Sequence, residues 1–216
     1  MTEVEIIQAE DVERFKSAQS IYISSWINFT VDLSEFKNLR SARIVSDKHK
    51  NLGLCRNLEE LTLAKVNEKK DQLSTLYKLC SLDISQGNLT NLSFLANLPN
   101  LQILRLAYLP KLTDVTALEN SPQLRELEVF SCKKARWANA LQNLRSLEKL
   151  ILDGCKFENL EWIKQLPKLS HLSLVGSDVR DGNISPAKHI AYVAIDNRRH
   201  YNYKFDHSDL RLIKKK

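Results

Sequence analysis

The chain is 216 residues long, 43% hydrophobic and 27% charged, with a formal net charge of +6. This balance is ordinary for a globular protein, and without a run of about 18 apolar residues no membrane span is expected. Five glycines and five prolines leave little room for long linkers. Four cysteines do not make a disulfide framework at this length, so we expect a cytoplasmic protein with reduced thiols.

Residues 1–17 are predicted to form an N-terminal cap. The chain starts with an acidic stretch. It lacks the basic start and the long apolar run that follows it in a signal peptide. Val12 and Phe15 lie three residues apart and lead, with the same spacing, to Ala18, where a repeated pattern begins. The segment is therefore expected to cover apolar surface that the first repeat would otherwise expose to water.

Residues 18–195 contain nine copies of one pattern, in which three apolar residues are separated by two and then by one arbitrary residue. The plainest copies include Leu58-Leu61-Leu63, Leu101-Leu104-Leu106 and Leu147-Leu150-Leu152. Neighbouring copies begin 19 to 23 residues apart, at positions 18, 39, 58, 79, 101, 124, 147, 169 and 190. A period of this length indicates a solenoid, in which each unit buries its apolar face only against its neighbours.

The second half of each unit has a three-residue rhythm. One example is the series Phe157, Leu160, Ile163, Leu166 and Leu169. This spacing fits the eclipsed side chains of a 3₁₀ helix better than the 3.6-residue period of a long α-helix. We therefore predict that each unit has a short strand followed by a 3₁₀ or brief helical turn.

Residues 196–216 are predicted to form a C-terminal cap and basic tail within the same domain. The segment 201–205 alternates like a strand, and the chain ends in Lys214-Lys215-Lys216. A cap at this end is needed to shield the edge of the last strand.

The repeat resembles the short leucine-rich repeats, of about 22 residues, of phosphatase-regulating and bacterial surface proteins. The resemblance implies a stand-alone, bacterial α/β solenoid with about nine parallel strands on a concave face and 3₁₀ or short helical turns on the convex face. One family feature is missing, because the ninth position of the repeat, normally Asn, holds Trp26, Asp47, Val66, Gly87, Leu109, Cys132, Cys155, Ser177 and Arg198. The turns after the strands are therefore expected to be irregular.

Side chains alternate along a strand, so the residues between the buried pattern positions should line the concave face. Four large apolar residues, Ile103, Tyr108, Phe130 and Ile151, fall there among charged ones, which is typical of a protein-binding hot spot. The predicted partner-binding residues are Arg43, Asp83, Ile103, Arg105, Tyr108, Glu126, Glu128, Phe130, Lys149, Ile151, Asp153, His171 and Tyr192.

Other kinds of site are disfavoured. His171, Ser173 and Asp153 fall on adjacent repeats, but an open sheet offers a hydrolase neither an oxyanion hole nor a closed pocket. The C-terminal histidines match no metal-ligand spacing, and no glycine-rich phosphate loop is present, so neither metal nor cofactor is expected. Much of the positive charge falls in turns such as 133–136 and in the tail. The mixed to slightly acidic binding face therefore argues against nucleic acid.

The sequence thus predicts a non-enzymatic protein-binding module that is monomeric before binding. Stand-alone repeat proteins of the family include inhibitors and toxin-immunity proteins, and this resemblance implies an inhibitory or neutralising role. An acidic and aromatic face would suit a basic toxin or nuclease. The alternative is a scaffold or regulatory subunit that positions an enzyme such as a phosphatase.

Overall fold

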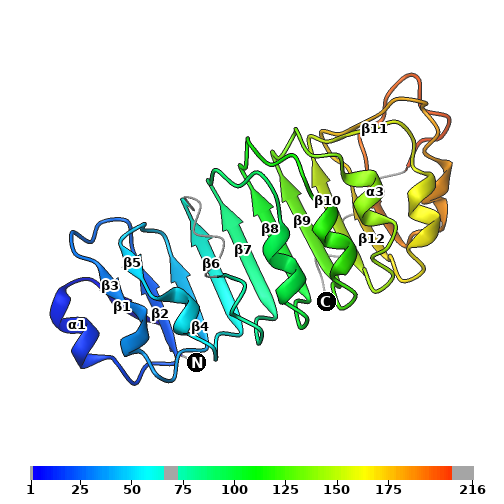
Figure 1. The fold of residues 1–216 in the computed structure, drawn as a ribbon. Coiled ribbons are helices and arrows are strands. Elements are labelled where there is room, and N and C mark those ends of the chain that lie inside the picture. Colours follow the sequence, from blue (N-terminus) through cyan, green and yellow to red (C-terminus); the bar gives the residue numbers. More distant parts are fainter. Residues whose placement is uncertain (1, 66–72, 206–216) are drawn as a thin grey trace.

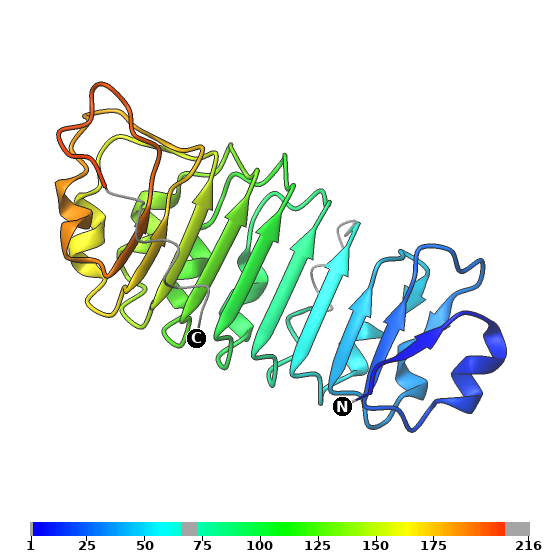
Figure 2. The ribbon, with the colours of Figure 1, turned by 180° about the vertical axis from the view of Figure 1, so that it is seen from behind.

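The structure, a computed structural model, describes residues 2–65 and 73–205. The chain winds so that its strands form one long parallel sheet, while most of the helical turns lie on the other side (Figures 1 and 2). Within the described residues the sheet has ten strands in the order β1-β2-β4-β6-β7-β8-β9-β10-β12-β14. Their bounds are Val4–Ile6, Ser20–Ile23, Ser41–Ile44, Glu60–Ala64, Ser81–Ser85, Ile103–Ala107, Glu126–Phe130, Lys149–Asp153, His171–Ser173 and Tyr192–Ala194.

All nine predicted strands are present, and each begins two residues after the first apolar residue of its repeat. The tenth strand, β1, comes from the first seventeen residues and pairs in parallel with β2. Two small parallel sheets join turns of neighbouring units. They pair β3 (Val31–Asp32) with β5 (His49–Lys50), and β11 (Lys156–Phe157) with β13 (Asp178–Val179).

In the part of the chain that the structure describes, six of the units have a 3₁₀ segment in their returning half, as the three-residue rhythm predicts, whereas the unit that starts at Leu124 has the short α-helix α3 there. The series Phe157, Leu160, Ile163, Leu166 and Leu169 is buried throughout. In the described residues the 3₁₀ segments are η1 (Leu33–Glu35), η2 (Leu52–Leu54), η3 (Ser93–Asn97), η4 (Thr116–Asn120), η5 (Glu161–Gln165) and η6 (Ser185–His189), and the α-helices are α1 (Ala9–Arg14) and α3 (Trp137–Leu141). No described helix is long and apolar enough to cross a membrane.

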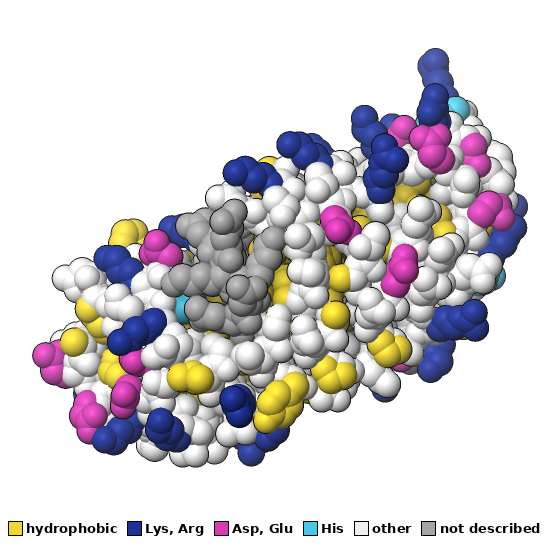
Figure 3. Space-filling view, viewed as in Figure 1, with side chains coloured by type: hydrophobic (Ala, Val, Ile, Leu, Met, Phe, Trp, Pro, Cys, Tyr) yellow, Lys and Arg dark blue, Asp and Glu magenta, His cyan; other side chains and the backbone are white. Residues whose placement is uncertain are grey.

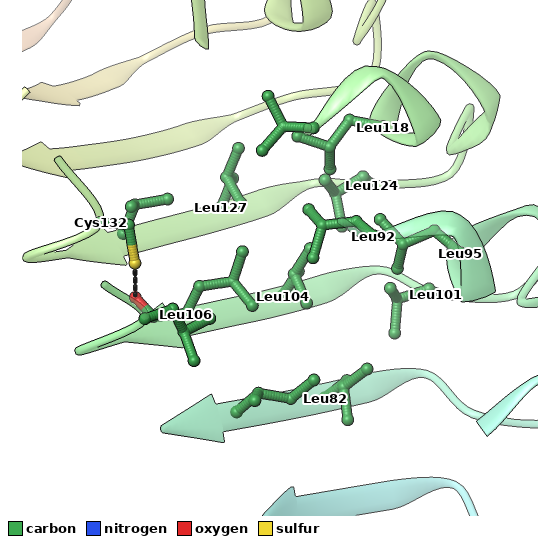
Figure 4. Packing of buried hydrophobic residues seen from close by; sticks show 14 of the residues in the cluster. Leu82, Leu92, Leu95, Leu101, Leu104, Leu106, Leu118, Leu124, Leu127 and Cys132 are labelled. Carbon is green, nitrogen blue, oxygen red and sulfur yellow. Dashed lines mark hydrogen bonds between the residues drawn. The ribbon is translucent and has the colours of Figure 1, made fainter. Parts of the chain in front are cut away.

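The core is a stack of identical repeat positions. Leu82, Leu104 and Leu127 are register partners on β7, β8 and β9, and all three are fully buried (Figure 4). Their neighbours Asp83, Arg105 and Glu128 lie on the opposite side of the sheet and are only half-buried. The predicted register is therefore confirmed.

Each of six consecutive strands is followed by a residue with left-handed backbone. These residues are Lys65, Gln86, Tyr108, Ser131, Gly154 and Gly176, with φ between 54° and 72°. In three of the turns the amide of this residue donates a hydrogen bond of 2.9 to 3.0 Å to a carbonyl of the next unit. The turn thus prolongs the ladder by one bond, although only glycine adopts such a φ without steric cost.

Residues at the ninth repeat position bond neighbouring turns in several ways. Ser177 donates from Oγ to the Leu152 carbonyl at 2.7 Å and accepts from the Cys155 amide at 2.9 Å. The Cys132 thiol lies 3.9 Å from the Leu106 carbonyl (Figure 4). The buried side chain of Leu109 contributes packing and has no polar group to bond a neighbouring turn, and Val66 lies outside the described residues. This mixture replaces the uniform asparagine series of the resembled family.

The first seventeen residues cover one end of the stack. Ile6 on β1 is fully buried, and Val12 and Phe15 pack against the core. Asp11 fixes the junction of β1 and α1, because one of its carboxylate oxygens accepts from the amides of Ile7 and Gln8, both at 3.0 Å. These bonds, with that from Gln8 contributing most, lower the pKa of the Asp11 carboxyl.

Residues 196–205 pack on the other end. Buried Tyr201 accepts a hydrogen bond from the Val179 amide at 3.1 Å. The Asn202 side-chain oxygen accepts from the Ile184 amide at 3.0 Å. The predicted strand at 201–205 is wrong, because these side chains satisfy the open backbone groups of the last unit and no strand forms there. The basic tail Lys214-Lys215-Lys216 lies outside the described residues.

Replacing Leu104 by alanine should lower the free energy of unfolding by about 2–5 kcal/mol, through lost burial and the cavity left behind. Urea denaturation followed by circular dichroism would measure this loss. The control Gln102→Ala, at an exposed position just before the same strand, should change stability by less than about 0.5 kcal/mol. Equal effects of the two variants would contradict the register.

Removal of residues 1–17 should lower the melting temperature and promote aggregation, because β2 would become an exposed edge strand over an uncovered core. Differential scanning calorimetry and light scattering would record both effects. Ile6→Ala should act in the same direction but more weakly, since it loosens β1 without removing it. An unchanged melting temperature for the truncated chain would show that this segment is not a cap.

Candidate protein-binding face

The candidate site is the side of the ten-stranded sheet that points away from the core, here called the strand face (Figure 2). It corresponds to the predicted concave face. The predicted partner-binding residues all lie on it, on β4 (Arg43), β7 (Asp83), β8 (Ile103, Arg105), the turn after β8 (Tyr108), β9 (Glu126, Glu128, Phe130), β10 (Lys149, Ile151, Asp153), β12 (His171) and β14 (Tyr192). Their role in binding stays a prediction.

The centre of the strand face is a network of five charges. Arg105 lies 3.6 Å from Asp83, 3.6 Å from Glu126 and 3.3 Å from Glu128. Lys149 lies 2.5 Å from Glu128 and 3.8 Å from Glu126. The parallel register creates the network, because Asp83, Arg105 and Glu128 are direct partners on adjacent strands. Two cations therefore hold three carboxylates in fixed positions.

The Asp83 carboxyl is a partly buried member of this network. Burial raises the pKa of its carboxyl, and the neighbouring Arg105 guanidinium opposes that rise. Its Oδ2 lies 3.5 Å from the Thr62 hydroxyl, while Oδ1 is buried without a hydrogen bond from the described residues. Arg105 thus offsets part of the effect of burial, but the pKa of the Asp83 carboxyl stays above its ordinary value.

The apolar residues of the strand face are interleaved with carboxylates and do not form one continuous patch. Register pairs Ile103 with Glu126, Ile151 with Glu128, and Phe130 with Asp153. All three apolar side chains are half-buried. Each thus presents an apolar surface directly beside an acidic group.

Tyr108 is the most exposed of the predicted apolar residues, at 59%. Its φ of 55° follows from the repeated turn after the strands. Its amide donates to the Phe130 carbonyl at 2.9 Å, so the backbones of the two aromatic residues are joined. The turn therefore holds an exposed ring on a fixed main-chain position.

The remaining predicted residues lie toward the ends of the face. Arg43 pairs with Glu3, and its guanidinium carbon lies 4.6 Å above the centre of the Tyr22 ring. His171 and Tyr192 have ring centres 5.6 Å apart. Arg43 is thus engaged by the N-terminal segment, and the structure does not bring it together with the central network.

Sequence reasoning missed the contribution of β1 to this face. Glu3 and Glu5 add two carboxylates beside Tyr22, and Ile7 is largely exposed after the strand. The alternation of Val4, Glu5 and Ile6 was the available signal. This alternation is only three residues long and lies outside the repeat, so the repeat pattern did not predict a strand there.

The strand face is more acidic than the chain as a whole. Among its described residues, the acidic ones are Glu3, Glu5, Glu60, Asp83, Glu126, Glu128, Asp153 and Asp196, and the basic ones are Arg43, Lys65, Arg105 and Lys149. Basic residues outnumber acidic ones in the described part of the chain as well, so their excess there lies outside the strand face. The molecule is therefore polarised, with a field that favours cations over this face.

The geometry offers little support for nucleophilic chemistry. His171 is engaged by Ser170, with Nδ1 2.9 Å from its hydroxyl, and no bond to Ser173 or Asp153 forms. All four cysteines are free, and burial raises the pKa of Cys55 to about 11 and that of Cys155 to about 12. In the described part of the chain, no group of three or more His, Cys, Asp or Glu residues is placed to hold a metal ion.

No protein-family model and no curated protein matches the chain. Solved structures do match it. Internalin F of Listeria monocytogenes superposes with a TM-score of 0.69 at 18% identity, over 90% of this chain and 59% of that one. A leucine-rich repeat protein of Leptospira interrogans gives a TM-score of 0.64 at 16% identity, over 94% of this chain and 60% of that one.

A structure of the Toll–Spatzle complex of Drosophila also matches, with a TM-score of 0.60 at 16% identity, over 74% of this chain and 24% of that one. The chain spans about 60% of the length of the two bacterial proteins. These likenesses confirm the predicted architecture: the fold of this chain is a leucine-rich repeat solenoid.

Proposed function

We propose that this protein is a non-enzymatic binding module that holds a basic protein on its strand face and thereby inhibits or neutralises it. The observation that carries the proposal is the polarity of the molecule. A chain with net positive charge presents an acidic face, and each half-buried apolar residue at the centre of that face lies beside a carboxylate. Such a surface matches a partner with cationic side chains around apolar ones.

The shape of the face favours a macromolecule over a metabolite. Ten parallel strands spaced by about 4.8 Å give a surface on the order of 40 Å long. A specific protein interface buries about 800 Å² on each partner, which this surface can supply without a closed pocket. The Toll–Spatzle match belongs to a complex, which supports protein binding as one use of the fold.

The central charge network supports tight and selective binding. Arg105 and Lys149 hold Asp83, Glu126 and Glu128 in position before a partner arrives. Less side-chain freedom is then lost on association. A cationic partner would also be drawn toward the acidic face during the encounter.

We further propose that the protein is a monomer before it binds its partner and that it acts in the cytoplasm. The four free cysteines support a reducing compartment. A scaffold that positions an enzyme would use the same face, so activity of the partner separates the two roles. Inhibition predicts that a stoichiometric amount of this protein abolishes the partner's activity, whereas a scaffold leaves that activity intact.

Tyr108→Ala and Phe130→Ala should each weaken binding by about 2 kcal/mol or more if these residues are anchors. Wild-type and variant proteins would be immobilised side by side to retain basic proteins from source-cell lysate. Purified candidates would then be measured by surface-immobilised kinetics. Trp26→Ala is a matched control, because Trp26 is 89% exposed but lies in the first repeat. Full binding by both anchor variants would overturn the proposal.

Neutralising the acidic face should slow association with the partner. Glu60→Gln combined with Asp153→Asn removes two carboxylates that take no part in an ion pair with the described residues, so the central network stays intact. The association rate constant should fall, and the difference from wild type should shrink as salt rises from about 0.05 to about 0.5 M. An unchanged rate at low salt would contradict electrostatic steering.

A further inference from the structure

A groove of about 780 Å³ lies away from the strand face, between the segments that follow β9 and β10. One wall is residues 133–142, which contain α3, and the other is residues 156–165, which contain β11 and η5. Figure 3 views the molecule from the side opposite the sheet, and Lys and Arg side chains line the upper edge of this view.

Four cations of this groove have no partner of their own. Lys133, Lys134, Arg136 and Lys156 line it, and among the described residues none of them makes an ion pair or a side-chain hydrogen bond. They include the basic turn at 133–136, to which the sequence analysis assigned no function. The fold brings that turn together with Lys156 of the next repeat.

The acidic residues of the groove are engaged by cations outside it. Glu158 lies 3.3 Å from Arg180, and Glu161 lies 2.5 Å from Lys164. Neither Arg180 nor Lys164 lines the groove. The groove therefore concentrates positive charge that is not neutralised within the described chain, which favours an anionic ligand.

The base of the groove is aromatic but closed. Trp137 is 1% exposed, and Phe157 and Trp162 are buried with ring centres 5.5 Å apart. The Trp162 indole donates to the Asn159 carbonyl at 3.2 Å, whereas the Trp137 Nε1 has no hydrogen-bond partner among the described residues. Because these rings are covered, they offer no open surface on which nucleotide bases could stack.

We propose that this groove is a second binding site, which takes an acidic peptide segment of a partner protein. Lys133, Lys134, Arg136 and Lys156 would meet its carboxylates. The amide side chains of Asn139, Gln142 and Gln165 also line the groove and can both donate to and accept from a peptide main chain. The site lies apart from the strand face, so it adds to the proposed function and does not depend on it.

A fluorescein-labelled peptide of eight glutamates is the probe, and fluorescence anisotropy is the measurement. The wild-type protein should bind it, and Lys133→Glu combined with Lys156→Glu should weaken binding at least tenfold. Lys37→Glu combined with Lys78→Glu changes the net charge equally at exposed lysines in the N-terminal half, and this control should stay within twofold of wild type. Equal losses in both double variants would overturn the proposal, because binding would follow net charge alone.

The indole N–H signals of the wild-type protein give a second readout that needs no variant. On adding the peptide, the Trp137 signal should shift in an ¹H–¹⁵N spectrum, and the Trp26 signal should not. A uridine octanucleotide that binds the groove as tightly as the peptide would overturn the peptide assignment in favour of nucleic acid. Displacement of the peptide by millimolar inorganic phosphate would overturn it in favour of a small-anion site.

Discussion

The fold of this molecule depends on the burial of one stripe of leucines between adjacent repeats. Leu104 lies between Leu82 and Leu127 only because β7, β8 and β9 stack in register. A single unit could not exclude water from them, so cohesion is shared between neighbours and the ends need separate covers. Residues 4–14 cover one end with a strand and a helix. Residues 196–205 cover the other end with irregular coil.

The same register determines which side chains the strand face presents. Once Leu104 and Leu127 face inward, Arg105 and Glu128 must face outward as partners on adjacent strands. A binding surface can therefore change residue by residue without disturbing the core, because inward and outward positions alternate. The basic groove at 133–142 and 156–165 arises differently, from turns whose lengths are not constrained by strand pairing.

Much of this arrangement was predictable from the sequence. The sequence shows both a repeat of about 22 residues and, within each strand, an alternation of apolar core positions with outward ones. The strands, the 3₁₀ turns and the outward position of Arg105 and Glu128 follow from them. Contacts that depend on non-repeating parts were not predictable. The β1 strand, the coil at 201–205 and the encounter of Lys156 with the 133–136 turn depend on single side chains and on loop paths.

The left-handed turn that follows six of the described strands has an energetic cost that depends on which residue occupies it. Gly154 and Gly176 occupy the equivalent position in two units, where glycine adopts the backbone without a clash. Tyr108 adopts it too, although a left-handed conformation costs an L-residue roughly 1–2 kcal/mol. Selection for folding alone would favour glycine there. Lys65, Gln86 and Ser131 carry the same cost in their units, so it belongs to the shared turn, and at Tyr108 that turn makes a large aromatic side chain project into solvent.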